Sequence, residues 1–152
     1  MKELKIDTMD STFVKNIHSS WAYVVVALIL ITLVTSAIFF FTKKELPLWF
    51  RKLLSFSMIS VHIQFLIGMV LMFISPAVSA ALSTGMGNVM KDSALRLLVV
   101  EHPMTMISAA LFLTVANAKT KKSADINGGT FLLILVAAAC VLSRIPWDQW
   151  HS

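Results

Sequence analysis

The chain has 152 residues, of which 57% are hydrophobic and only 14% charged, and its mean hydropathy is +0.80. Soluble domains have an apolar share of about 45–50%, so this composition excludes a protein whose main solvent is water. The formal net charge is +5, but no basic run with interleaved aromatic residues is present, which argues against nucleic-acid binding. The length allows a single domain, residues 1–152.

Apolar residues fall into four blocks that are separated by short polar segments. A helix needs about 20 apolar residues to cross the hydrocarbon of a bilayer, and continuous apolar runs favour helices over the alternating strands of a barrel. Short connections favour antiparallel neighbours. We therefore expect an all-α integral membrane protein, an up-down-up-down four-helix bundle, with spans at about 12–42, 52–75, 93–117 and 129–146.

In the first span, Asp10, Ser11 and Thr12 can cap a helix, which predicts a start near Thr12. The connection between the second and third spans is the longest, from Pro76 to about Lys91, and could form a lid over one end of the bundle. Asp92 follows it and can cap the third span. The fourth span is short, and Trp147 and Trp150 beyond it resemble interfacial anchors.

Basic residues gather in the first and third connections, whereas the second connection offers only Lys91. By the positive-inside rule these two connections face the cytoplasm, so both termini face outward. The basic residues concerned are Lys43, Lys44, Arg51, Lys52, Lys119, Lys121 and Lys122.

Three histidines, His18, His62 and His102, lie in or at the edge of predicted spans, whereas His151 lies in a tail that we expect to be solvated. Ionisable residues in a membrane are costly and often functional. The simpler alternative for each is a neutral imidazole that is hydrogen-bonded to a neighbouring helix. Cys140 is the only cysteine, so a CxxCH haem attachment is impossible and any haem is held non-covalently.

Depth decides which histidines can hold one haem from opposite sides. At the helical rise, His18 lies about 9 Å into the first helix and His102 about 12 Å into the third, whereas His62 lies about 20 Å deep. The first and third helices are diagonal in such a bundle. We therefore expect His18 and His102 to be the two metal ligands of a haem b near the outer leaflet.

The second helix offers Gly68, four residues after Gln64, as a face for this cofactor. His62 points nearly the opposite way from Gln64, because two residues turn a helix by about 200°. His62 stays a candidate site residue, and a structural or proton-handling role suits it better than ligation.

Arg96 and Arg144 lie near the outer ends of their helices, where they could bind haem propionates or lipid headgroups. Glu101 could orient the neighbouring imidazole, move a proton, or face water. Pro103 disfavours helical geometry at His102, which predicts a kink there. The methionine spacing matches no defensible copper motif, and methionine commonly fills apolar cores.

The segments HSSWAY, HIQFLIGMVLMFISP, MKDSALRLLVVEHPMTMIS and SRIPWDQW together resemble a family of small bacterial four-span membrane proteins labelled cytochrome b. The order of histidine, QxxxG helix and histidine is also distantly similar to one half of haem A synthase. That resemblance implies a histidine pair from diagonal helices that holds haem, and it maps onto His18 and His102. In this chain Ser19 follows His18 in place of the histidine–arginine pairing typical of the synthase.

The residues and the resemblance together predict a b-type cytochrome in the bacterial inner membrane that exchanges electrons with quinone or a partner protein. A second hypothesis is a haem-free accessory or scaffold subunit of a larger membrane complex. A haem-modifying enzyme is a third, which a single bundle with one haem position disfavours. These residues are compatible both with an enzyme and with a protein that has no catalytic activity.

Overall fold

Helices make up nearly all of the structure. The computed structural model describes the backbone of residues 2–146 and the side chains of residues 11–146, and this part contains no strand. The all-α fold class is therefore confirmed, whereas Trp147, Trp150 and His151 lie outside the described residues. The elements are α1 (Lys2–Thr42), α2 (Leu48–Ile74), α3 (Pro76–Ser83), α4 (Met86–Lys91), α5 (Ser93–Arg96), the π-helix η1 (Leu97–Glu101), α6 (His102–Thr120) and α7 (Gly128–Ser143).

Three helical segments are long and apolar enough to cross a bilayer. They are Ser11–Thr42, Leu48–Ile74 and Ser93–Thr120. α7 is apolar but has 16 residues, which is about 24 Å at the helical rise. The structure therefore supports a helical membrane protein, and the fourth crossing stays a prediction.

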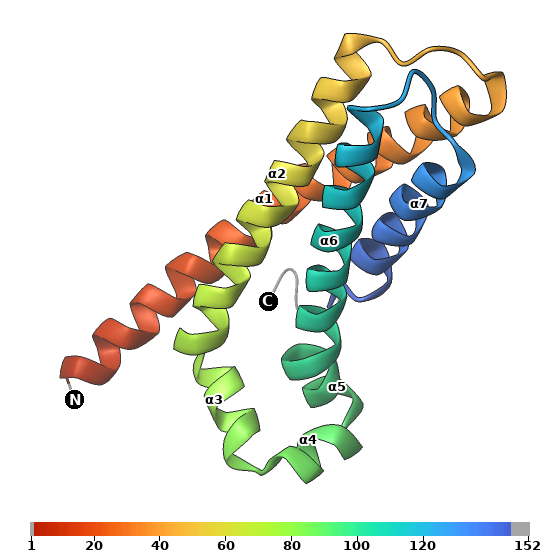
Figure 1. The fold of residues 1–152 in the computed structure, drawn as a ribbon. Coiled ribbons are helices and arrows are strands. Elements are labelled where there is room, and N and C mark those ends of the chain that lie inside the picture. The colour runs from red at the N-terminus through yellow and green to blue at the C-terminus, as the bar shows by residue number, and fades with distance from the viewer. Residues whose placement is uncertain (1, 147–152) are drawn as a thin grey trace.

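The helices α1, α2, α6 and α7 pack in a ring. α1 contacts α2, α2 contacts α6, α6 contacts α7, and α7 contacts α1. Neighbouring helices in this ring run in opposite directions (Figure 1). α1 and α6 therefore lie on a diagonal, as the short connections predict. Alanines let α6 and α7 approach closely, since Ala109, Ala116 and Ala137 are fully buried.

The two lysine-rich connections lie at the same end of the bundle and bind each other. The Leu46 N–H donates to the Ala124 carbonyl at 2.7 Å, and the Arg51 guanidinium donates to the Ser123 carbonyl at 2.7 Å. Ile126 is fully buried beside them. The basic residues of both connections therefore share one end of the molecule.

Two helices begin earlier than the sequence predicts. α1 starts at Lys2 rather than near Thr12, because the residues before Thr12 include neither glycine nor proline to interrupt a helix. α2 starts at Leu48 rather than at 52, directly after Pro47, whose extended backbone suits a helix start. α7 ends at Ser143 instead of 146.

The segment after α2 is mostly helical rather than a simple loop. Ser75 caps α3 by accepting a hydrogen bond from the Val78 N–H, and Pro76 occupies the first turn, as is common at helix starts. Gly85, with φ of +90°, joins α3 to α4, a conformation that glycine adopts without strain. We call α3 and α4 the helical cap, and it packs through the buried cluster Val78, Ala81, Val89 and Val99.

The helical segment that carries His102 contains one wide turn. Asp92 caps its start, as predicted, by accepting from the Ala94 and Leu95 N–H groups. The π-helix η1 then ends immediately before His102 and Pro103. His102 itself is helical, with φ of −61° and ψ of −51°, although Pro103 disfavours this conformation at the preceding residue. Proline crowds the preceding turn, and the distortion lies there, in η1.

Candidate functional site

His18 and His102 meet across the diagonal of the bundle. Their ring centroids are 6.2 Å apart and the ring planes are inclined by 82°. α1 supplies His18, and His102 is the first residue of α6. The shared depth inferred from helical rise is therefore confirmed, and the two imidazoles form the centre of the candidate site.

Both imidazoles line a cavity of about 480 Å³ between α1, α2, α6 and the helical cap. Pockets that hold small molecules or cofactors are commonly about 300–1,000 Å³. At the end near the helical cap, the lining includes the polar residues Ser11, Thr12, Lys15 and Ser75 beside the apolar Pro76, Ala77 and Val78. Farther along α1, α6 and α7 the lining becomes apolar, with Ala22, Val25, Val26, Met106 and Val141.

Gln64 of α2 holds His18 at both its backbone and its ring. Gln64 Nε2 donates to the His18 carbonyl at 2.9 Å and lies 3.3 Å from His18 Nε2. Because an amide nitrogen only donates, His18 Nε2 accepts and the ring proton is on Nδ1. Within the part of the chain that the structure describes, His18 Nδ1, Gln64 Oε1 and Ser60 Oγ are buried without a hydrogen-bond partner. Such unpaired buried atoms are rare, and a bound group is one explanation for them.

Gly68, a candidate cofactor contact, packs against the His18 ring. A Cβ at Gly68 would lie 3.0 Å from His18 Cε1. Because Gly68 follows Gln64 by one helical turn, the two residues share a face of α2. Glycine at this position therefore makes room for the imidazole itself, and α2 sets the position of a side chain that belongs to α1.

His102 is fixed by the end of α7. Its Nδ1 lies 2.8 Å from the Arg144 carbonyl oxygen. Since a carbonyl only accepts, Nδ1 carries the proton and Nε2 keeps its lone pair. Histidines that bind metals usually donate their other N–H to a carbonyl or carboxylate in this way. His102 therefore has the tautomer that a metal ligand needs.

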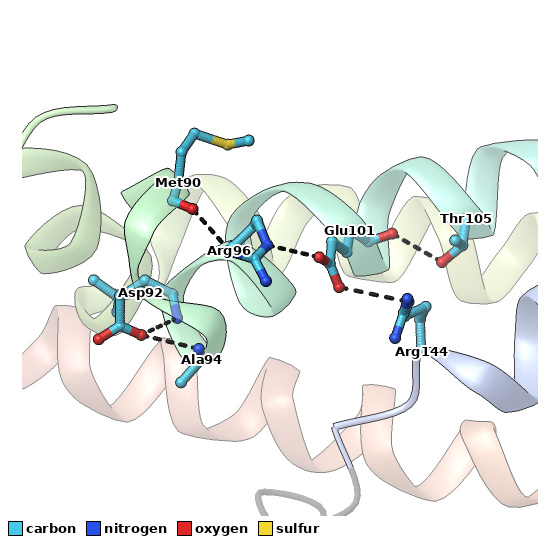
Figure 2. Close-up of polar contacts among 8 residues, drawn as sticks. Met90, Asp92, Ala94, Arg96, Glu101, Thr105 and Arg144 are labelled. Carbon is cyan, nitrogen blue, oxygen red and sulfur yellow. Dashed lines mark hydrogen bonds and ion pairs between the residues drawn. The ribbon is translucent and has the colours of Figure 1, made fainter. Parts of the chain in front are cut away.

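Arg96 and Arg144 both pair with Glu101. Arg96 Nε donates to Glu101 Oε1 at 2.8 Å, and Arg144 Nε lies 3.5 Å from Glu101 Oε2. Figure 2 shows the carboxylate between the two arginines. Neither arginine lines the cavity. Both were expected to bind haem propionates, but in the structure they bind the Glu101 carboxylate instead. Arg144 connects Glu101 to His102, because its side chain pairs with Glu101 and its carbonyl accepts a hydrogen bond from His102 Nδ1.

His62 lies outside the cavity, on the side of α2 that faces α6. Its Nδ1 lies 2.8 Å from the Met58 carbonyl oxygen, and its Nε2 lies 3.4 Å from Thr114 Oγ1 of α6. It is absent from the cavity lining, whereas Gln64 is part of it. The opposite orientation of His62 and Gln64, predicted from the helical turn, is confirmed.

Lys15 is a cavity residue that sequence reasoning missed. Among the described lining residues it is the only lysine or arginine. Lys15 precedes His18 by three residues, and residues at that spacing share one face of a helix. The spacing from His18 was the feature of the sequence that could have identified Lys15 as a cavity residue.

No protein-family model, curated protein or solved structure matches the chain. Within the described residues, no group of three or more His, Cys, Asp or Glu side chains is placed to hold a metal ion. A metal between His18 and His102 would therefore take its remaining ligands from outside the described residues.

Proposed function

We propose that this protein is a membrane b-type cytochrome that holds one haem between α1 and α6, with His18 and His102 as axial ligands, and transfers electrons to or from quinone or a partner protein. The separation of 6.2 Å between the two imidazole centroids carries the proposal. Two imidazoles on opposite sides of one metal ion, each bonded at about 2 Å, have centroids about 6 Å apart.

The donor atoms of both histidines fit this role. His102 donates its Nδ1–H to Arg144, which leaves Nε2 for a metal. His18 Nε2 is 3.3 Å from the Gln64 amide, longer than the usual 2.7–3.2 Å, so a metal bond would replace only a weak contact. A haem held by these two histidines would supply one-electron chemistry, at a potential set by its ligands and by burial.

The cavity also suits a flat molecule with one acidic edge. Lys15 and the hydroxyl groups of Ser11, Thr12 and Ser75 lie at the polar end. An ammonium group attracts carboxylates such as haem propionates. The aliphatic end of the cavity would accommodate the apolar part of such a group. In this orientation Lys15 takes the part that the sequence suggested for Arg96 and Arg144.

We further propose that the chain crosses the bacterial inner membrane four times, with both termini outside. The basic connections at one end of the bundle support this orientation. The cavity lies toward the opposite end, which places the haem near the outer leaflet. α7 would complete the fourth crossing, and a helix slightly shorter than the hydrocarbon is accommodated by local thinning of the bilayer.

An optical spectrum of the detergent-purified protein, oxidised and then reduced, tests the haem proposal. We expect a sharp α-band in the reduced state and one haem per chain, either as purified or after titration with haem. A protein that takes up no haem in the titration would contradict the proposal.

The second candidate is a haem-free accessory subunit of a larger membrane complex. It is favoured by the hydrogen bonds that tie each histidine to another helix, His18 to Gln64 and His102 to the end of α7. Interhelical hydrogen bonds of this kind hold membrane bundles together. In that case, affinity purification from the native membrane would recover a stoichiometric partner subunit, and the purified protein would show no haem spectrum.

A further inference from the structure

A second polar site lies where α2 packs against α6, away from the cavity. His62 of α2 and Thr114 of α6 approach to 3.4 Å there, and we call this pair the His62 site. The proposed haem does not use it. His62 is half-buried and Thr114 is exposed on the surface of the bundle, so a molecule in the bilayer can reach the pair.

The geometry fixes the tautomer of His62. Its Nδ1 lies 2.8 Å from the Met58 carbonyl oxygen. A carbonyl has no proton to give, so Nδ1 must carry the proton and donate it. The Nε2 of the neutral ring therefore has a lone pair and can only accept.

Thr114 satisfies that lone pair only weakly. A hydroxyl group has one proton, and the Thr114 hydroxyl donates it to the Ala110 carbonyl at 2.8 Å. The 3.4 Å separation from His62 Nε2 is longer than an ordinary hydrogen bond. His62 Nε2 thus lacks a good donor within the described residues.

This acceptor lies deep in the apolar part of the bundle. His62 is about 20 Å from each end of α2 at the helical rise. Exposed apolar side chains surround this level of the two helices: Ile59, Ile63, Leu66, Leu111 and Val115. Water is scarce in the hydrocarbon core, and an unsatisfied polar group there is costly. A hydroxyl-bearing molecule dissolved in the membrane would supply His62 with a stronger donor than Thr114 does.

We propose that the His62 site binds a membrane-dissolved hydroquinone, whose phenolic O–H donates to His62 Nε2. The long hydrogen bond at His62 Nε2 is the observation that favours a lipid-soluble donor. The choice of a hydroquinone rests on the proposed electron-transfer function, because hydroquinones combine a hydroxyl donor with electron transfer in the lipid phase.

Histidine-¹⁵N-labelled protein in lipid nanodiscs tests the proposal. A hydroquinone with a decyl chain is titrated in, and its dimethyl ether, which has no hydroxyl proton, serves as the matched ligand control. We expect the hydroquinone to shift the His62 Nε2 resonance to saturation and the ether to leave it unchanged. Empty nanodiscs correct for partition of both ligands into lipid.

Substitutions locate the binding. His62→Phe should weaken hydroquinone binding by about tenfold, the equivalent of about 1.4 kcal/mol. Ser108→Ala is the control, since Ser108 is also on α6 and its hydroxyl donates to the Met104 carbonyl. The Ser108→Ala variant should bind the hydroquinone with the same affinity as the unmodified protein. Equal affinity of His62→Phe, equal binding of the ether, or no saturable shift would overturn the proposal.

Two further measurements distinguish this proposal from the haem proposal and from dimerisation through the His62 site. His18→Ala removes a proposed haem ligand, and we expect its hydroquinone affinity to be unchanged. Binding at His62 in a protein that takes up no haem would contradict the haem proposal alone. If the protein forms dimers in detergent that His62→Phe dissociates, a second copy occupies the site and the hydroquinone proposal is wrong.

Discussion

Gly68 and His18 are in direct contact, so tightly that a Cβ at Gly68 would lie 3.0 Å from His18 Cε1. Together with the Gln64 hydrogen bonds, this contact means that α2 determines where the His18 ring sits. The position of a proposed haem ligand on α1 therefore depends on two residues of another helix.

Gly68→Ala tests this dependence. The added methyl group must push the imidazole away, and overpacking of this kind costs about 1–3 kcal/mol. We expect haem affinity to fall and the electron paramagnetic resonance spectrum of the oxidised haem to change. Gly87→Ala is the matched control, because no atom of the described residues lies within 4 Å of a Cβ at Gly87. If the two variants behave alike, contact with Gly68 does not position His18.

Lys15→Gln tests the orientation of the haem in the cavity. A cation beside the propionates disfavours the more positive oxidised haem, so its removal should lower the midpoint potential. We expect a fall of up to about 60 mV, which corresponds to a tenfold change for one electron. Lys15→Arg keeps the charge and should keep the potential in a redox titration. An unchanged potential in Lys15→Gln would place the propionates elsewhere.

Glu101→Gln should loosen the contact between η1 and the end of α7. The variant loses the charge that pairs with Arg96 and Arg144. These groups are partly exposed, so solvent screens the ion pairs and we expect the thermal unfolding midpoint to fall only slightly. Thermal unfolding in detergent measures the change. Glu45→Gln, at an exposed position in the first connection, is the control and should unfold at the original temperature.

Single cysteines test the orientation in the membrane, in a background where Cys140 is replaced by alanine. An impermeant thiol reagent applied to intact cells should label Ser83→Cys in the helical cap, and it should label Ala124→Cys only after lysis. Both positions are exposed in the structure. A cysteine appended to the C-terminus should also be labelled in intact cells if α7 completes a fourth crossing. Labelling of Ala124→Cys alone would show that the orientation is inverted.

Hydrophobic patterning was sufficient to predict the bundle and the juxtaposition of His18 and His102. Span length and helical rise are nearly fixed quantities, so they located His102 opposite His18 across a long stretch of sequence. They also placed His62 on the other side of α2. The start of α1 was predicted wrongly, because a capping sequence at Asp10 to Thr12 does not end a helix that can continue on its N-terminal side.

The polar partners within the site were harder to predict. Arg96 and Arg144 were expected to bind propionates, but both pair with Glu101. Their pairing depends on where α7 ends and on the wide turn η1, and neither is visible in residue spacing. Lys15 was accessible to the same argument as Gln64 and Gly68, since it shares a helix face with His18.

The most direct test of the central claim compares three single variants, His18→Ala, His102→Ala and His62→Ala. Haem per protein and spin state are measured for each after purification with haem supplied. We predict that His18→Ala and His102→Ala each lose low-spin haem, because their imidazoles face the same cavity and no other histidine lines it among the described residues. His62→Ala should keep the spectrum of the unmodified protein, since His62 contacts α6 outside the cavity. Loss of low-spin haem in His62→Ala, with retention in His18→Ala, would contradict the assignment of the axial ligands.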